Sequence, residues 1–167
     1  MLKLLGFAVL LAACSSSSSS SIDGTIRGVE FASTDAIVLG SGAQVEIVLA
    51  GVNSCVPPAQ QVQHPGETAL LLILQDPSQV TPGSYPVVTS SSARAAEVEG
   101  NILDAMCLNN ADNDAVASLG TVTLTNVDGS EYDGSFDVTF DSGDHVTGSF
   151  SATQCDQPKN PEPSCQP

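Results

Sequence analysis

The clearest pattern of hydrophobic and polar positions lies between residues 119 and 154. Three segments share it: residues 120–125 (GTVTLT), 134–139 (GSFDVT) and 148–153 (GSFSAT), each beginning 14 residues after the one before. Apolar and polar side chains alternate within each copy, which is the period of a half-buried β-strand. Turn residues separate the copies at 128–130 and 142–144. The pattern predicts three antiparallel strands in a meander.

The faces of this meander constrain its loops. Its apolar positions are even-numbered, and directly opposed residues of an antiparallel pair point to the same face. A two-residue turn at Asp128–Gly129 would oppose even to odd positions and turn one strand's apolar side chains to solvent. We therefore expect three-residue loops or an equivalent bulge, with Val127 opposite Glu131 and Asp141 opposite His145.

The same register predicts which residues of the three strands lie side by side. Phe136 should lie between Val122 and Phe150, Gly134 between Leu124 and Ala152, and Val138 between Gly120 and Gly148. The other face carries threonine, serine and aspartate side chains and no aromatic residue. Because a sugar-binding face usually offers a ring for stacking, we expect a solvated sheet face here.

Shorter strands are predicted upstream of the meander. They fall at residues 24–31, 36–39, 44–49, 83–89 and 95–108, and a polar loop follows at 109–114. The solid apolar run Leu70–Leu74 favours a strand covered on both faces. A short helix with Glu67 in its first turn is the alternative.

The frequent turns and the scarcity of helical periodicity indicate an all-β fold. We expect an antiparallel β-sandwich or a partly closed barrel of about eight or nine strands that ends in the three-strand meander. The β-domain should span residues 22–154, with a Pro-rich tail at 155–167. The length of 167 residues fits one domain.

The N-terminus has the pattern of an export signal. Lys3 is followed by ten uncharged, mostly apolar residues, 4–13, which in a helix would rise about 15 Å, roughly half of a hydrocarbon core. The segment Leu11-Ala12-Ala13-Cys14 resembles the lipobox of bacterial lipoproteins. That resemblance implies removal of residues 1–13, a diacylglycerol thioether on Cys14 and an acyl chain, such as palmitate, on the new amine. A plain secretory signal is the alternative.

A run of seven serines, Ser15–Ser21, follows Cys14. Its composition predicts a flexible tether, so that residues 14–21 would form an acylated cysteine with its linker. Because one acyl chain binds a membrane only marginally, the implied set of chains is a durable anchor. Position 15 holds serine rather than aspartate, which resembles the sequence of lipoproteins that enteric-type bacteria sort to the outer membrane. The expected location is the cell envelope, at the outer membrane.

The strong negative charge of the chain excludes nucleic acid as a partner. The chain carries 19 acidic and four basic side chains. Only Arg27, Arg94 and Lys159 are basic after Cys14, where all 19 acids lie, so the processed protein has a net charge of −16. Such a surface repels nucleic acid and anionic headgroups. Membrane attachment should therefore come from the lipid on Cys14.

The remaining cysteines are even in number. Cys55, Cys107, Cys155 and Cys165 in an exported chain predict two disulfides. Sequence alone allows three pairings. We favour Cys55 with Cys107 and Cys155 with Cys165, because the second pair would hold the Pro-rich tail against the domain.

Catalytic signatures are scarce. The chain has no nucleophile elbow, zinc-binding helix, phosphate loop or dinucleotide fingerprint. His64 and His145 lie in predicted loops, where solvent exposure is the simpler interpretation. A triad of Asp144 and His145 with a nearby serine would make a hydrolase, although serine is abundant enough for this proximity to be expected.

Calcium is the one metal that the loops suggest. Acidic residues gather at Asp128, Glu131, Asp133, Asp141, Asp144 and in Asp112-Asn113-Asp114, and hard oxygen ligands suit calcium. No run completes a calcium loop, since Val116 and Ala117 occupy the fifth and sixth positions of a loop that begins at Asp112. Turns also attract aspartate for backbone reasons, so no metal is the favoured interpretation.

Taken together, these features are similar to small all-β lipoproteins of bacterial envelopes, a group from which no activity can be carried over. We expect a membrane-anchored, non-enzymatic binding or structural module without a cofactor. Its partner would be an envelope protein or polysaccharide. The alternative is a barrel-type carrier of a small apolar ligand.

Overall fold

A computed structural model describes residues 19–31, 33, 35–51, 55, 62–88, 93–109, 112–155 and 164–166. The predicted signal peptide, Cys14, serines 15–18 and most of the Pro-rich tail lie outside the described residues. The described residues form β-strands and no helix, which confirms the all-β prediction. The strands are β1 (Ser19–Ile26), β2 (Val29–Glu30), β3 (Asp35–Ser41), β4 (Gln44–Ala50), β5 (Val62–Gln63), β6 (Thr68–Gln75), β7 (Gly83–Pro86), β8 (Ala95–Ile102), β9 (Ala115–Asp128), β10 (Glu131–Phe140), β11 (His145–Gln154) and β12 (Ser164–Cys165).

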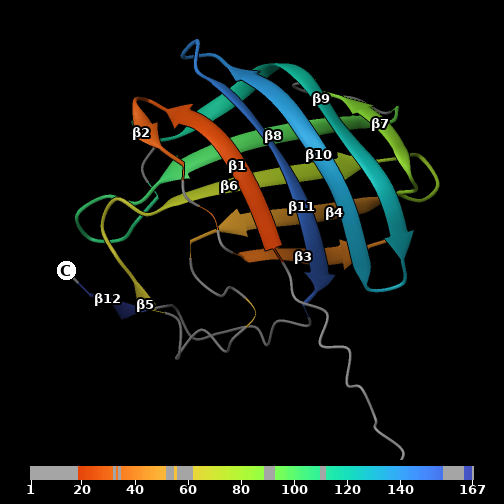
Figure 1. The fold of residues 1–167 in the computed structure, drawn as a ribbon, viewed down its shortest axis with the longest axis horizontal. Helices are drawn as coiled ribbons and strands as arrows, with labels where there is room; N and C mark the ends of the chain where they lie inside the picture. The colour runs from red at the N-terminus through yellow and green to blue at the C-terminus, as the bar shows by residue number, and fades with distance from the viewer. Residues whose placement is uncertain are drawn as a thin grey trace, which may run out of the picture.

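Seven strands close into a barrel, in the order β3-β4-β6-β8-β9-β10-β11. Figure 1 shows β9, β10, β11 and β1 passing across the strands of the opposite wall. The ring is closed by β11 and β3, which pair in parallel at Thr153–Ile37 and Gln154–Val38. The fold is therefore a closed, mixed barrel rather than a sandwich. Its other ring pairings are antiparallel, as expected.

Two further strands, β7 and β1, pair with ring strands where the neighbouring ring pairing is short. β8 and β9 pair only at Glu99–Val116 and Gly100–Ala115, and β7 then continues along β9. On the other side, β1 pairs with β11 from Ser19 to Gly24, before β11 reaches β3. β1 begins within the serine run, so the last three serines of the expected tether belong to the sheet.

The meander is confirmed, and its first hairpin has the expected bulge. Phe136 lies opposite Val122, as predicted, but the register shifts between Asp133 and Gly134. Tyr132 therefore lies opposite Val127, and the predicted pairing of Val127 with Glu131 is wrong. A two-residue turn plus a bulge keeps both apolar faces inward.

The second hairpin has a three-residue loop, but it is placed one residue earlier than predicted. Phe140 N donates to Asp144 O at 2.9 Å, so residues 141–143 form the loop and the pairing of Asp141 with His145 is wrong. Phe136 consequently lies opposite Gly148, and Phe150 lies opposite Gly134. The even-numbered apolar side chains still oppose one another, but each lies opposite a residue two positions away from the predicted one.

The barrel interior is filled by side chains. Leu70, Leu72 and Leu74 of β6 are fully buried there, together with Ile47 and Leu49 of β4. The run at residues 70–74 is a strand, so the helix alternative is wrong. Its outer residues, Leu71 and Ile73, are half-buried rather than covered.

The four cysteines form two disulfides, with a different pairing from the one we favoured. Cys55 is bonded to Cys155, and Cys107 is bonded to Cys165. Cys155 follows β11 directly, and its backbone N–H donates to Val38 O at 2.9 Å. The first disulfide therefore fixes the chain beside the β3–β11 closure. The second ties the C-terminal β12 to the loop after β8.

Candidate functional site

A small surface pocket lies at one end of β4, β6 and β8. Its volume is about 180 Å³. Apolar residues, Val48, Ala50, Ala69 and Leu103, form part of its lining, and its polar groups are Gln63, Glu67, Thr68, Asn101 and Asn109. A pocket for a drug-sized ligand is larger, about 300 to 1,000 Å³. An apolar cavity of about 150 Å³ holds benzene, so this pocket suits one small group or side chain.

Backbone hydrogen bonds hold the polar wall of this pocket in place. Gly66 N donates to Leu103 O, and Leu103 N donates to Glu67 O, both at 2.9 Å. Glu67 N donates to His64 O at 3.2 Å. These bonds join the turn before β6 to the end of β8, so Glu67 and Leu103 face the pocket from a fixed frame.

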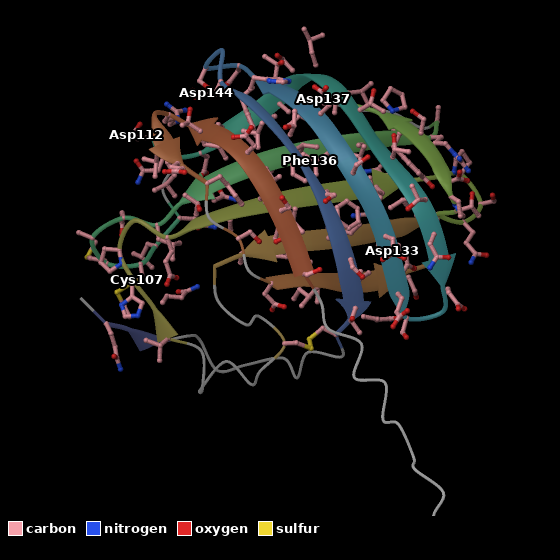
Figure 2. The ribbon with its side chains drawn as sticks, viewed as in Figure 1. Cys107, Asp112, Asp133, Phe136, Asp137 and Asp144 are labelled. Carbon is pink, nitrogen blue, oxygen red and sulfur yellow. A yellow bond between two sulfur atoms is a disulfide. The ribbon has the colours of Figure 1, made fainter. Side chains whose placement is uncertain are left out.

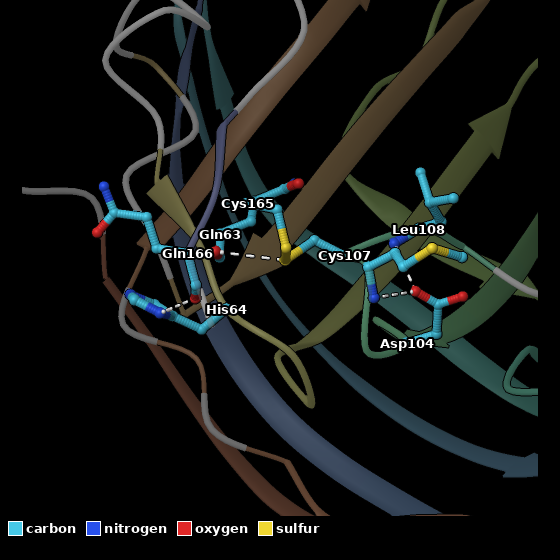
Figure 3. The surroundings of a disulfide bond; sticks show 8 residues. Gln63, His64, Asp104, Cys107, Leu108, Cys165 and Gln166 are labelled. Atoms are coloured by element: carbon cyan, nitrogen blue, oxygen red, sulfur yellow. Dashed lines mark hydrogen bonds between the residues drawn. A yellow bond between two sulfur atoms is a disulfide. The ribbon is translucent and has the colours of Figure 1, made fainter.

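The Cys107–Cys165 disulfide stabilises the same wall (Figure 3). Cys107 Sγ lies 3.4 Å from Gln63 O, and β12 pairs with β5 in parallel at Ser164–Val62 and Cys165–Gln63. His64 Nδ1 lies 2.8 Å from Gln166 O. The C-terminal residues thus hold Gln63 against the barrel.

The loop after β8 is ordered by one carboxylate. Asp104 Oδ1 accepts hydrogen bonds from Met106 N at 2.7 Å and from Leu108 N at 3.0 Å. Cys107 adopts a positive φ of 57° at this point, which lets the chain turn back towards β5. Asp104 and Cys107 therefore act together to present Asn109 at the pocket.

The acidic residues proposed for calcium are dispersed. Figure 2 shows Asp112 and Asp144 at one end of the barrel and Asp133 at the other. Asp133 accepts a hydrogen bond from Asn126 Nδ2 at 3.1 Å. Over the described ranges, no three His, Cys, Asp or Glu side chains are grouped to hold a metal ion.

The residues of the possible triad have separate partners. His145, the first residue of β11, contacts Asp137 at 2.8 Å through Nε2. Asp144 instead accepts a hydrogen bond from Ser142 Oγ at 2.7 Å. Within the described part of the chain, no serine hydroxyl is hydrogen-bonded to His145, so these residues do not form a Ser-His-Asp relay.

Asp144 has a structural environment. It accepts a hydrogen bond from Arg27 N at 2.6 Å, and the guanidinium of Arg27 donates to Asp114 O. Arg27 and Gly28 both have positive φ, 49° and 76°, as in a type I′ hairpin turn between β1 and β2. The hydrogen bonds from Ser142 and then Arg27 lower the pKa of Asp144. This network joins three loops at one end of the barrel.

A second polar network closes the loop between β6 and β8. Asp76 and Arg94 form an ion pair at 2.8 Å, and the Arg94 guanidinium stacks over the fully buried Tyr85, 4.9 Å from the ring centroid. Tyr85 Oη donates to Thr81 O at 2.6 Å. The backbone N–H of Ser78 and the Arg94 side chain lower the pKa of Asp76 to about 2 despite its burial. These groups are engaged with one another rather than facing the pocket.

A second hollow, more open and with a volume of about 370 Å³, follows the β1–β2 hairpin. Asp23 and Glu30 contribute its carboxylates, and Ile22 and Phe31 contribute its apolar surface. It lacks the fixed polar wall and the adjoining disulfide of the first pocket. The pocket beside Glu67 is therefore the better-built candidate site.

Sequence reasoning missed this candidate site. The sequence places Glu67 only in the first turn of the alternative helix, Asn101 within the predicted strand segment 95–108 and Asn109 in the polar loop that follows. The nearest signal was the cysteine count, because Cys107 and Cys165 bring the wall together. Their pairing depends on tertiary structure.

Comparisons with known proteins add no relatives: no family model, curated protein or solved structure matches the chain. Among the described residues, no helix is long and apolar enough to span a membrane.

Proposed function

We propose that this protein is a lipid-anchored module of a bacterial cell envelope that binds a partner and carries out no catalysis. The observation that carries the proposal is the short distance between the lipobox and the barrel. Four residues separate Cys14 from Ser19, where β1 begins. The five Cα–Cα steps between them span at most about 18 Å.

This spacing supports a specific arrangement at the membrane. A lipid on Cys14 would hold the start of β1 close to the headgroups, together with the β9–β10 turn, because Ser19 pairs with Ser151 near that end. The net charge of −16 would repel anionic lipids. The barrel would therefore stand on the membrane through its lipid alone, with its side walls free to meet an envelope protein or polysaccharide. Confinement at the surface raises the local concentration of such a partner.

A carrier of a small apolar ligand is the second candidate, and the closed barrel is the observation in its favour. Such a carrier needs a void inside the barrel. The interior positions of β4, β6, β9 and β10 are occupied by packed aliphatic and aromatic side chains, and the pocket beside Glu67 lies outside the ring. We therefore rank the carrier below the surface-binding module.

Membrane fractionation of the full chain in an enteric-type host tests the anchor. The wild-type protein should remain in the outer-membrane fraction after high-salt and carbonate washes, and Cys14→Ala should lose the lipid. Ser15→Asp is the matched variant for sorting, and it should move the lipidated protein to the inner membrane. Release of the wild-type protein by salt alone would overturn the proposal.

A further inference from the structure

The outer surface of the barrel is divided into two chemically different walls. The outer residues of β9, β10 and β11 are mostly threonine, serine and aspartate, as a solvated sheet face requires, and Leu119 is an isolated exposed leucine among them. The wall formed by β3, β4 and β6 instead presents half-buried Leu39, Val48, Leu71 and Ile73 on its outside. We call these four side chains the apolar outer patch.

Strand register makes this patch contiguous. Val48 lies directly opposite Leu71, and Glu46 lies opposite both Leu39 and Ile73. Directly opposed side chains on one face have Cβ atoms about 5 Å apart. The apolar outer patch therefore crosses three strands without a polar gap wider than one glutamate.

Carboxylates border the patch on β8. Glu99 lies opposite Leu71, and Glu97 lies opposite Ile73. Burial raises the pKa of Glu99, and the charges of Glu97, Asp114 and Glu46 raise it further. Among the described residues, the two arginines are engaged elsewhere, Arg27 with Asp114 and Asp144 and Arg94 with Asp76. The border is thus a group of like charges that an incoming cation would stabilise.

The pocket beside Glu67 adjoins the same wall. Val48 belongs to both the patch and the pocket, and Ala69 and Asn101 continue the outer face into the pocket. Its polar groups include a carboxylate and side-chain amides, whose oxygens accept hydrogen bonds from ammonium or guanidinium groups. A volume of about 180 Å³ suits one long side chain.

We propose that this wall docks an apolar, basic segment of a protein partner, whose apolar side chains pack on Leu71 and Ile73 while one Lys or Arg enters the pocket beside Glu67. The inference rests on the proposed function as a binding module and names its partner's chemistry. Charge complementarity selects this occupant. A second copy of the chain would bring another −16 charges to the face, and an anionic bilayer would be repelled in the same way.

The test measures binding of a short synthetic peptide of alternating leucine and lysine to the full, oxidised chain in detergent, by fluorescence anisotropy. Two matched peptides have glutamate in place of lysine or serine in place of leucine. We expect binding of the first peptide only, weaker at high salt, with slower amide exchange in β4 and β6. No binding, or equal binding of the three peptides, would overturn the inference.

Variants locate the bound peptide. Leu71→Ser should weaken binding by about tenfold to a hundredfold, the loss expected for one apolar contact. Its control is Leu119→Ser, which changes a leucine on β9 that is 68% exposed.

The double variant Glu97→Gln with Glu99→Gln should weaken peptide binding several-fold and reduce its salt dependence. It should leave the fold intact, because it removes charges that repel one another. Its control is Asp128→Asn with Asp141→Asn, two exposed carboxylates at the end of β9 and in the loop after β10.

Other occupants would give different results, and each would overturn the inference. A dimer that Leu71→Ser abolishes would assign the wall to a second copy. Protection of β6 by a lipid nanodisc without peptide would assign it to the membrane. Failure of the anchor is separable, because a protein that is not lipidated could still bind the peptide through this wall, and an anchored protein could fail to bind it.

Discussion

At the scale of single residues, the meander is organised by two phenylalanines that lie over two glycines. Phe136 lies opposite Gly148, and Phe150 lies opposite Gly134. A Cβ atom at position 148 would lie 2.6 Å from Phe136 Cζ, and one at position 134 would lie 2.7 Å from Phe150 Cζ. Two of the three repeat glycines, Gly134 and Gly148, therefore lie where the neighbouring strand places a ring.

This contact predicts a cost for one added methyl group. Gly148→Ala should lower the free energy of unfolding by about 1 to 3 kcal/mol, because the Phe136 ring or the backbone of Ser21 must move. The exposed neighbour provides the control, and Ser149→Ala should stay within about 0.5 kcal/mol of the wild type. Urea unfolding of the oxidised proteins measures both. Equal stability of Gly148→Ala and wild type would contradict the packing described here.

Asp76 predicts a pH dependence at the same scale. Its pKa is about 2, below the ordinary 3.8, because Ser78 N–H and Arg94 stabilise the carboxylate. A lowered pKa means that the stabilisation is fully present above the unfolded pKa and is lost as pH falls towards 2. Asp76→Asn should therefore be less stable than wild type at pH 7, with a difference that shrinks between pH 4 and pH 2.

Chemical unfolding across this pH range measures that difference. Asp141→Asn controls for the loss of one negative charge from an exposed loop. A difference between Asp76→Asn and wild type that stayed constant from pH 7 to pH 2 would argue against the ion pair as its source.

At the scale of strands, the sequence predicted what depends on neighbours along the chain. The alternation of apolar and polar residues located β9, β10 and β11. The even numbering of their apolar positions correctly predicted that Phe136 and Val146 share the inner face. Parity alone does not distinguish a loop at 141–143 from one at 142–144 with the opposed pairs shifted by two, so the register differed. β1 begins at Ser19, five residues before the predicted strand at 24–31 and three before the predicted start of the domain. Serine is a common linker residue but is also compatible with a strand, and here it pairs along β11.

The two disulfides have different structural roles, and their removal should separate them. The pair Cys55→Ala and Cys155→Ala opens a link across 100 residues beside the β3–β11 closure. Because the unfolded chain regains the entropy of this loop, the free energy of unfolding should fall by about 4 to 5 kcal/mol. Thermal unfolding of the barrel should therefore be strongly affected.

The pair Cys107→Ala and Cys165→Ala should act locally. It releases the two-residue β12 and loosens β5, so amide exchange at Val62 and Gln63 should accelerate while β9 to β11 stay protected. Hydrogen exchange with mass spectrometry compares the two double variants. Unchanged exchange in β5 would show that the disulfide does not hold the pocket wall.

At the scale of the whole molecule, the short alternating segments predicted the all-β class. They did not predict that the sheet closes into a complete barrel. The ring closes through a two-residue parallel pairing of β3 with β11, segments that are far apart in the sequence. The candidate pocket was equally hidden, because Gln63, Glu67 and Asn101 meet only after β5, β6 and β8 are assembled. The pattern of apolar and polar residues shows the local period of a strand and which side chains share a face. It does not show which distant segments come into contact once the chain has folded.

The proposed anchor places a lipid on Cys14, and the intact mass of the native protein reports that lipid and the first residue of the chain together. Protein extracted in detergent should begin at Cys14 and carry the mass of a diacylglyceryl group and an acyl chain. Reduction should then add four hydrogens, for the two disulfides. A mass that fits a chain beginning at another residue, or one without lipid, would contradict the account.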